Sequence, residues 1–277
     1  MEKIIDIGQY VAVVVKWLTE NLRPFFDFIK ITGNGGIEGL EWIFVSLPFY
    51  VTIALFAFAA WKQAGKGTAL FTVLGFALIY LMGFWVETMQ TLALIISSTL
   101  IALVIAVPLG IWAAKKESAN RIIRPLLDLM QTMPAFVYLI PAVLFFSIGK
   151  LPGAFATIIF AMPPAVRLTT LGINQVPQDV IEAAHSLGAT SRQILFKVEL
   201  PLATKTILTG INQTILLSLS MVVIAGMIAA GGLGEKVLEG INNLDIGLGF
   251  ESGLSVVILA IILDRITQAF GNKSTQK

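Results

Sequence analysis

Apolar residues form long blocks along most of this chain, and polar residues gather in short stretches between them. Seven blocks are apolar enough to be membrane-crossing helices, each of which needs about 20 residues. They cover residues 42–60, 68–86, 89–113, 133–148, 151–166, 204–230 and 250–266. This pattern predicts an all-α integral membrane protein with about seven transmembrane helices, a transmembrane domain over residues 42–270 and a tail at 271–277.

The fourth and fifth blocks are shorter than a full crossing and are rich in proline. Proline removes a backbone donor from a helix and clashes with the preceding turn. We therefore expect tilted or broken helices here, whose freed backbone groups face protein or a cavity rather than lipid. The prolines in or beside these blocks are Pro134, Pro141, Pro152, Pro163 and Pro164.

Residues 1–41 precede the blocks and have a different pattern. Within 2–30, apolar residues recur at helical spacing on one face, and polar residues occupy the opposite face. The apolar face holds Ile4, Ile7, Val11, Val14, Leu18, Leu22 and Phe25; the polar face holds Asp6, Gln9, Lys16, Glu20, Arg23 and Asp27. We expect an amphipathic helix at the membrane interface or against the protein's own spans, interrupted at Pro24, and a flexible linker at 31–41.

Lysine and arginine are distributed unevenly between the two sides of the predicted spans. Thirteen of the 19 fall in loops of one side or in the C-terminal tail, and four of the other six lie in the N-terminal segment. Because cytoplasmic loops are enriched in these residues, the pattern predicts an external N-terminal segment and a cytoplasmic C-terminus. The expected location is a bacterial cytoplasmic membrane, with membrane lipid around the spans.

Composition narrows the possible chemistry. Of 277 residues, 56% are hydrophobic and only 13% charged, with no cysteine and one histidine. Thiolate metal sites and disulfides are therefore excluded, and a membrane enzyme has few groups to work with. The net charge of +2 does not indicate a nucleic-acid partner. We interpret His185 as a surface residue rather than a pH sensor.

One polar stretch, residues 182–201, reads EAAHSLGATSRQILFKVELP. Its charges make it an improbable span, so it is expected to be part of a cytoplasmic loop, residues 167–203. Locally it reads as helix, break, helix: Pro177 suits a first helical turn, Gly188 a left-handed cap, and Thr190 with Gln193 a capping box. Pro201 limits the second helix. From composition alone, an ordinary solvated loop is the simpler interpretation.

The exact residues of this stretch resemble the EAA motif of bacterial ABC importer permeases. In that motif EAA is followed by three residues, Gly, nine residues, Ile, any residue, and Leu-Pro. The matching positions are Glu182, Ala183, Ala184, Gly188, Val198, Leu200 and Pro201, with valine in place of isoleucine. The resemblance implies that this loop docks in a groove of an ATPase subunit and couples its ATP hydrolysis to transport.

The same resemblance implies partners. The sequence has no phosphate-binding GxxxxGK[ST] loop, so ATP and Mg²⁺ would be held by a separate ATPase, present in two copies. No cofactor is expected in this chain, and no catalytic residue. An extracellular substrate-binding protein and a second copy of the permease complete the expected assembly.

Two further stretches indicate the solute. Residues 126–141, LLDLMQTMPAFVYLIP, and residues 200–234 resemble permeases of the glycine betaine and proline betaine importers. This implies transport of a compatible solute. Choline, carnitine or methionine remain alternatives within the class, and an ATP-independent channel or carrier is an alternative outside it.

Candidates for the translocation pathway come from aromatic and polar residues within the blocks. Aromatic faces can bind a quaternary ammonium group, although aromatic residues in spans more often face lipid or the interface. Polar residues in spans tend to face a cavity or neighbouring helices, so hydrogen-bonded helix packing is an equal alternative. The pathway candidates are Met133, Phe136, Tyr138, Asn212, Gln213, Ser218 and Ser220. Asp264 and Arg265 are expected to form a local ion pair.

Overall fold

The structure, a computed structural model, describes residues 7–273, and these residues are helices joined by short turns, with no strand among them. The predicted all-α fold class is confirmed. The helices are α1 (Ile7–Asn21), α2 (Arg23–Ser46), α3 (Phe49–Ala64), α4 (Lys66–Leu81), α5 (Trp85–Lys115), α6 (Glu117–Thr132), α7 (Leu139–Phe146), α8 (Lys150–Asn174), α9 (Gln178–Ser186), α10 (Ser191–Ile194), α11 (Leu200–Ala225), α12 (Gly232–Asn242) and α13 (Ile246–Lys273). Two 3-10 turns, η1 (Ala135–Tyr138) and η3 (Gly226–Ile228), and a π-helical turn, η2 (Leu195–Glu199), lie between them.

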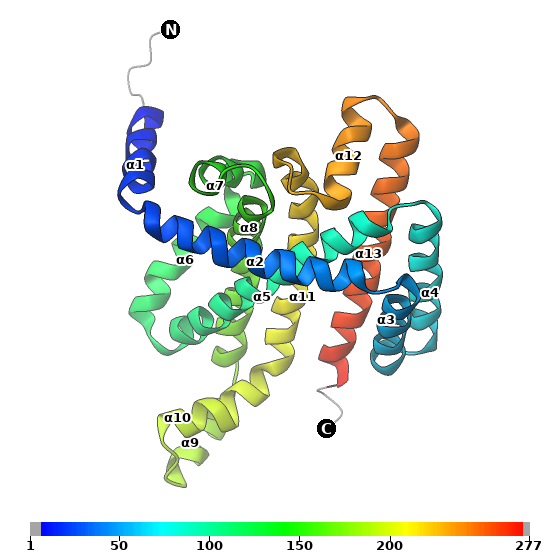
Figure 1. Ribbon diagram of the computed structural model, residues 1–277. Coiled ribbons are helices and arrows are strands. Elements are labelled where there is room, and N and C mark those ends of the chain that lie inside the picture. The colour runs from blue at the N-terminus through cyan, green and yellow to red at the C-terminus, as the bar shows by residue number, and fades with distance from the viewer. Residues whose placement is uncertain (1–6, 274–277) are drawn as a thin grey trace.

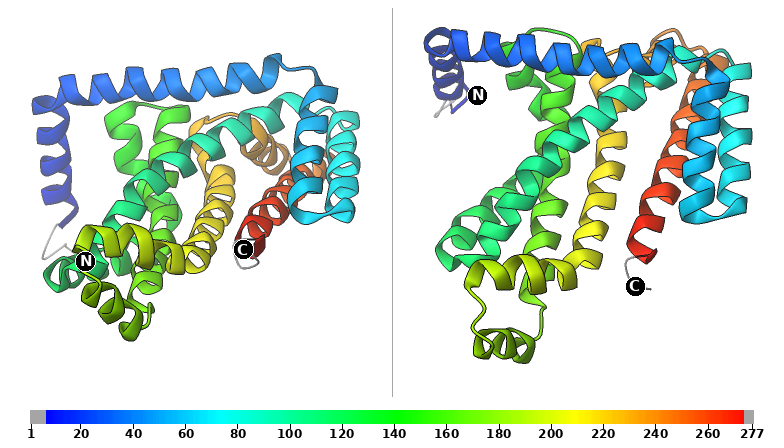
Figure 2. Two further views of the ribbon diagram at one scale, coloured as in Figure 1. Left: turned by 90° about the horizontal axis from the view of Figure 1, so that it is seen from below. Right: turned by 60° about the horizontal axis from the view of Figure 1, so that its bottom comes forward.

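Long helices form the centre of the molecule (Figure 1). α8 packs on both α5 and α11, and α13 packs on α11 and on the α3–α4 hairpin. The long helix α2 lies across one end of this bundle, and α9 and α10 project from the opposite end (Figure 2). The molecule therefore has two different ends, one covered by α2 and one carrying the polar stretch.

The predicted blocks correspond to apolar helices of three kinds. By length and composition α5, α8, α11 with its flanking turns, and α13 can each cross a membrane alone. Two bent pairs, α2 with α3 and α6 with η1–α7, pass the same test only together, with bends of 102° and 109°. The remaining block is the shorter apolar helix α4. The predicted first span, 42–60, begins too early, because residues 42–46 belong to α2 and the chain turns at Pro48 before α3.

The predicted linker at 31–41 is wrong, because α2 continues through it without interruption. Its glycines suggested a break, since glycine is a poor helix former. Tertiary packing overrides that preference at Gly33, where an added Cβ would lie 2.6 Å from Leu151 of α8. The interruption expected near Pro24 is confirmed: α1 ends at Asn21, and Pro24 lies in the first turn of α2. Ile4 and Asp6 lie outside the described residues.

Polar contacts hold α2 onto the end of the bundle. Glu41 accepts a hydrogen bond from Lys150 Nζ at 2.5 Å and another from Gln90 Nε2 at 3.1 Å. Gln90 Oε1 in turn accepts from the backbone N–H of Gly232, which begins α12. Toward the other end of α2, Phe26 stacks on Phe145 with ring centroids 4.6 Å apart. These contacts join α2 to α5, α7 and α8, and Gln90 of α5 links them to α12.

The sequence predicts a tilted or broken helix around Pro163 and Pro164, and the structure shows no break there. α8 runs through both residues for 25 residues, well beyond the predicted 151–166. Both prolines are buried, so neighbouring helices surround the turn that they disturb, which is how membrane helices tolerate proline. By contrast, Pro134 lies at the sharp bend between α6 and η1, as expected.

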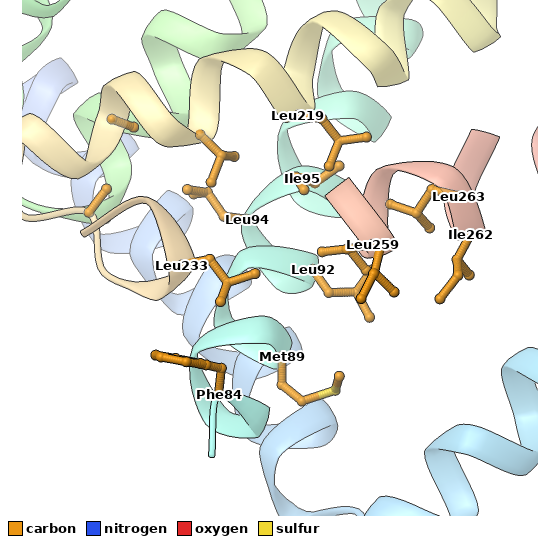
Figure 3. Packing of buried hydrophobic residues seen from close by; sticks show 14 of the residues in the cluster. Phe84, Met89, Leu92, Leu94, Ile95, Leu219, Leu233, Leu259, Ile262 and Leu263 are labelled. Carbon is orange, nitrogen blue, oxygen red and sulfur yellow. The ribbon is translucent and has the colours of Figure 1, made fainter. Parts of the chain in front are cut away.

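The bundle core is apolar and closely packed. Met89, Leu92 and Ile95 of α5 meet Leu219 of α11 and Leu259 of α13 in its largest cluster (Figure 3). Small residues bring the helix backbones close together elsewhere. A Cβ added at Gly110 of α5 would lie 2.6 Å from Cβ of Thr169 in α8. This is the packing expected between membrane helices.

Candidate functional site

The polar stretch forms a bent, projecting unit that we call the coupling segment, residues 177–199. It contains α9, α10 and the π-helical turn η2, which leads directly into α11. α9 and α10 lie at the tip of the end opposite α2 (Figure 2). Pro177 is the N-cap of α9, one position before the first turn where the sequence placed it. The predicted helix, break, helix arrangement is confirmed. The expected end of the second helix at Pro201 is wrong, because α10 and η2 continue through Pro201 into α11.

Gly188 makes the bend between the two helices. Its φ is +80°, a left-handed conformation that costs glycine little. The N–H of Gly188 donates to the carbonyl of His185 at 2.9 Å, and the N–H of Ala189 donates to the carbonyl of Ala184 at 3.1 Å. These bonds satisfy carbonyls at the end of α9. A Cβ at Gly188 would meet nothing within 4 Å, so its backbone conformation, not space, requires glycine here.

Thr190 and Gln193 form the predicted capping box at the start of α10. The Thr190 N–H donates to Gln193 Oε1 at 2.8 Å, and the Gln193 N–H donates to Thr190 Oγ1 at 3.4 Å. This reciprocal pair supplies acceptors for backbone N–H groups that the helix itself cannot satisfy. The bend is therefore fixed from both sides, by a glycine cap and by a capping box.

The surface of the coupling segment is partly apolar although it projects from the bundle. Leu187 is 89% exposed at the tip, and Phe196 is 57% exposed. Of the motif residues, Glu182, Ala183, Gly188 and Pro201 are exposed, whereas Ala184, Val198 and Leu200 are partly buried. A hollow of about 350 Å³ opens between the end of α9 and the helix formed by α10 and η2. It is lined by Ala184, Leu187, Gly188, Ala189, Gln193, Lys197 and Val198. The tip therefore combines an exposed leucine with an adjacent hollow.

Pro201 explains why the turn before it is π-helical. Proline has no N–H to donate to the carbonyl of Lys197, and its ring crowds that carbonyl. The turn widens instead, and the N–H of Leu200 donates to the carbonyl of Leu195, five residues earlier. At this turn Glu199 lies 3% exposed and forms an ion pair with Lys115, the last residue of α5. The sequence alone does not predict this pair, although Glu199 is a single carboxylate flanked by apolar residues.

The structure separates the predicted pathway residues into two groups. Asn212 and Ser218 join helices. Asn212 Nδ2 donates to Asp264 Oδ1 at 3.1 Å and its Oδ1 accepts from Thr267 at 2.6 Å, which connects α11 to α13. Thr99 of α5 donates to Ser218 Oγ at 3.1 Å. Asp264 takes Asn212 and Gln268 as partners, not Arg265 as expected.

The other predicted pathway residues lie at or near the surface of the single chain. Gln213 and Ser220 are exposed on one side of α11, and Phe136 of η1 is 56% exposed. The turn η1 that carries Phe136 packs against α11. Met133 is partly buried where α6 ends. Tyr138 is buried, and its hydroxyl donates to the carbonyl of Met130 at 2.7 Å, which makes it a packing residue.

Within residues 7–273, no three carboxylate or histidine side chains are grouped so that they could hold a metal ion. His185 is exposed on α9, as interpreted from the sequence. This end of the molecule therefore presents a partly apolar, projecting surface.

Comparison with known proteins identifies the family. Residues 106–275, more than half of the chain, match the family described as "Binding-protein-dependent transport system inner membrane component". The chain belongs to this family. The matched region runs from within α5 to the C-terminal end and includes the entire coupling segment.

Individual members of the family are similar over nearly the whole chain. The glycine betaine permease OpuAB of Bacillus subtilis is 52% identical over 268 residues, covering 95% of this chain and 94% of that protein. The glycine betaine/proline betaine permease ProW of Escherichia coli is 50% identical, covering 99% of this chain and 77% of that protein. The glycine betaine/carnitine permease GbuB of Listeria monocytogenes is 49% identical, covering 98% and 97%.

Solved structures support the fold. A chain of the inward-facing MetNI methionine ABC transporter superposes with a TM-score of 0.59 at 24% identity, covering 69% of this chain and 93% of that one. A second crystal form gives the same TM-score at 22% identity. At this identity the likeness concerns the permease fold and not the solute.

Proposed function

We propose that this permease is the transmembrane subunit of an ATP-driven, binding-protein-dependent importer of glycine betaine or a related compatible solute. The observation that carries the proposal is the coupling segment, in which the motif residues form a rigid projecting bend at one end of a transmembrane bundle. The solute class rests on about 50% identity to glycine betaine permeases over nearly the whole chain.

The proposed partners follow from the two ends of the molecule. Two ATPase subunits, each holding ATP and Mg²⁺, would receive the coupling segments of two permease copies on the cytoplasmic side. Leu187 and the adjacent hollow fit a docking contact, because an exposed apolar side chain favours burial at an interface. A separate substrate-binding protein would dock at the end covered by α2, which would face outward.

The proposed mechanism is movement of two rigid bundles. ATP closes the ATPase dimer and draws the coupling segments together, which opens the pathway to the outside; hydrolysis resets it. Gln213, Ser220 and Phe136 lie on the surface of the single chain and would line a pathway between the two copies. Asn212 and Ser218 would hold their helices together.

The experiment is uptake of labelled glycine betaine into proteoliposomes that contain this permease with its cognate ATPase and binding protein. Uptake should require ATP on the ATPase side and should be competed by proline betaine but not by methionine. Uptake without ATP would refute the importer and favour a channel or carrier. ATP-driven uptake of methionine or choline, without betaine uptake, would keep the importer and refute the solute.

A further inference from the structure

One ion pair joins the coupling segment to the transmembrane core. Lys115 is the last residue of α5, and its Nζ contacts Oε2 of Glu199 in η2. The two side chains differ in exposure, 39% for Lys115 and 5% for Glu199. A carboxylate this well buried requires a charged partner, because an unpaired charge there is strongly destabilising.

Within the described part of the chain, this pair is the side-chain polar contact that links residues 177–199 to another helix. The other side-chain hydrogen bonds of the segment are local. Ser186 Oγ donates to the carbonyl of Glu182, and Thr190 pairs with Gln193. Lys115 therefore provides a connection that the backbone alone does not provide.

The position of the pair matters because the backbone beside it is irregular. The π-helical turn is the last part of the coupling segment, directly before α11, and Pro201 removes a helical hydrogen bond at the same place. A force applied at the tip can deform this turn before it reaches α11. Glu199 is the last residue of this turn, so its ion pair holds the end of the turn, next to α11, against the end of α5, which packs on α8, α11 and α13.

We propose that Lys115 and Glu199 are positioning residues that transmit displacement of the coupling segment to α5. This inference rests on the proposed function, in which the segment is moved by an ATPase. It assigns the pair a mechanical role: with the pair intact, η2 and the end of α5 move as one body. Without it, the segment still docks, but the end of η2 moves without α5, and its displacement reaches α5 only indirectly, through α11.

The test uses the permease assembled with its ATPase and binding protein. Glu199→Gln and Lys115→Gln each remove one charge, and the double variant Lys115→Glu/Glu199→Lys restores the pair in reverse. The matched control is Glu117→Gln, which removes a carboxylate from the exposed pair with Arg121 near the same end of the molecule. The readouts are ATPase co-purification, basal hydrolysis, and the stimulation of hydrolysis by solute-loaded binding protein.

Both single variants should retain the ATPase and basal hydrolysis but lose stimulation about tenfold, within the range of measured coupling between sites. The double variant should regain most of it, and Glu117→Gln should behave as wild type. Stimulation at the wild-type level in either single variant would overturn the proposal. So would a double variant that assembles but is no better than the single variants.

A second measurement needs no disabling variant. The chain has no cysteine, so spin labels can be attached at Trp112→Cys in α5 and Phe196→Cys in η2, both of which are exposed. The distance between the labels should stay constant between the nucleotide-free and ATP-trapped complexes. A changing distance would overturn the proposal. A wild-type complex that hydrolyses ATP but does not take up betaine would refute the solute, while this distance would still decide the role of the pair.

Discussion

At the residue scale, Gly188 shows how one backbone conformation determines the shape of a surface. The left-handed turn at this residue ends α9, and the capping box of Thr190 and Gln193 then starts α10. The direction of α10 relative to α9 therefore depends strongly on the left-handed backbone conformation of Gly188. Because the residue is exposed and uncrowded, a substitution there tests conformation and not packing.

Gly188→Val should leave membrane insertion intact and reduce the coupling of ATP hydrolysis to uptake. A β-branched residue strongly disfavours positive φ, at a cost of about 1–2 kcal/mol or more. The measurement is the ratio of solute transported to ATP hydrolysed in proteoliposomes. Gly188→Asn is the control, because asparagine tolerates the left-handed region. Equal ratios for Gly188→Val and wild type, at equal expression, would contradict this role.

At the element scale, α5, α8 and α11 are held together by small residues and by a few polar pairs. Gly110 permits the closest approach of α5 to α8, and Thr170 Oγ1 donates to the carbonyl of Gly110 at 3.0 Å. Without a hydrophobic driving force between helices in lipid, such packing supplies much of the stability.

Gly110→Ala should destabilise the bundle by about 1–3 kcal/mol, because the new methyl group overlaps Thr169 and the carbonyl of Val166. The control is Gly39→Ala within α2, where a Cβ meets nothing within 4 Å and alanine favours the helix by up to about 1 kcal/mol. Thermal unfolding of the two purified variants should shift in opposite directions. A wild-type unfolding temperature for Gly110→Ala would refute the tight contact.

The sequence predicted the coupling segment almost residue by residue, because caps depend on neighbours within four positions. Thr190, Gln193 and Gly188 determine their own turns regardless of the rest of the fold. In contrast, the helical state of residues 31–41 depends on Gly33 meeting Leu151, more than a hundred residues later. The Lys115–Glu199 pair is equally non-local, and no local pattern could reveal which cation meets Glu199. Helix caps and turns could be predicted from neighbouring residues, whereas contacts between residues far apart in the sequence could not.

Helix α6 illustrates the same limit. Its buried residues, among them Ile123, Leu127 and Met130, alternate with polar ones, so no apolar block marked it as a helix of the bundle. Its polar face nevertheless contributes to packing, because Asp128 accepts a hydrogen bond from Arg167 of α8. An amphipathic helix of this kind contains no continuous apolar run, so its place in the bundle is not evident from hydrophobicity alone.

At the scale of the whole molecule, the two ends of the helix bundle differ in the helices that they carry and in the lysine and arginine residues assigned to them. One end carries α2, with Glu41 paired to Lys150; the other carries the coupling segment. The distribution of lysine and arginine predicts that the second end is cytoplasmic.

Single cysteines can test this orientation, since the chain has none of its own. Leu244→Cys lies at an exposed turn between α12 and α13, and Ser118→Cys lies in the first turn of α6, beside the end of α5. In intact cells a membrane-impermeant maleimide should label Leu244→Cys only, and permeabilisation should add Ser118→Cys. The reverse labelling pattern would show the opposite orientation in the membrane, with the coupling segment outside the cytoplasm.

In the proposed assembly, a separate ATPase binds the coupling segment. The most direct measurement is the amount of cognate ATPase that co-purifies with Leu187→Asp, compared with Leu244→Asp. Leu187 and Leu244 are 89% and 87% exposed, so neither change disturbs the core, and they lie at opposite ends. Leu187→Asp should weaken ATPase binding by about 2 kcal/mol or more, because it places a charge in an apolar contact, and Leu244→Asp should retain it. Full retention by Leu187→Asp would contradict the account.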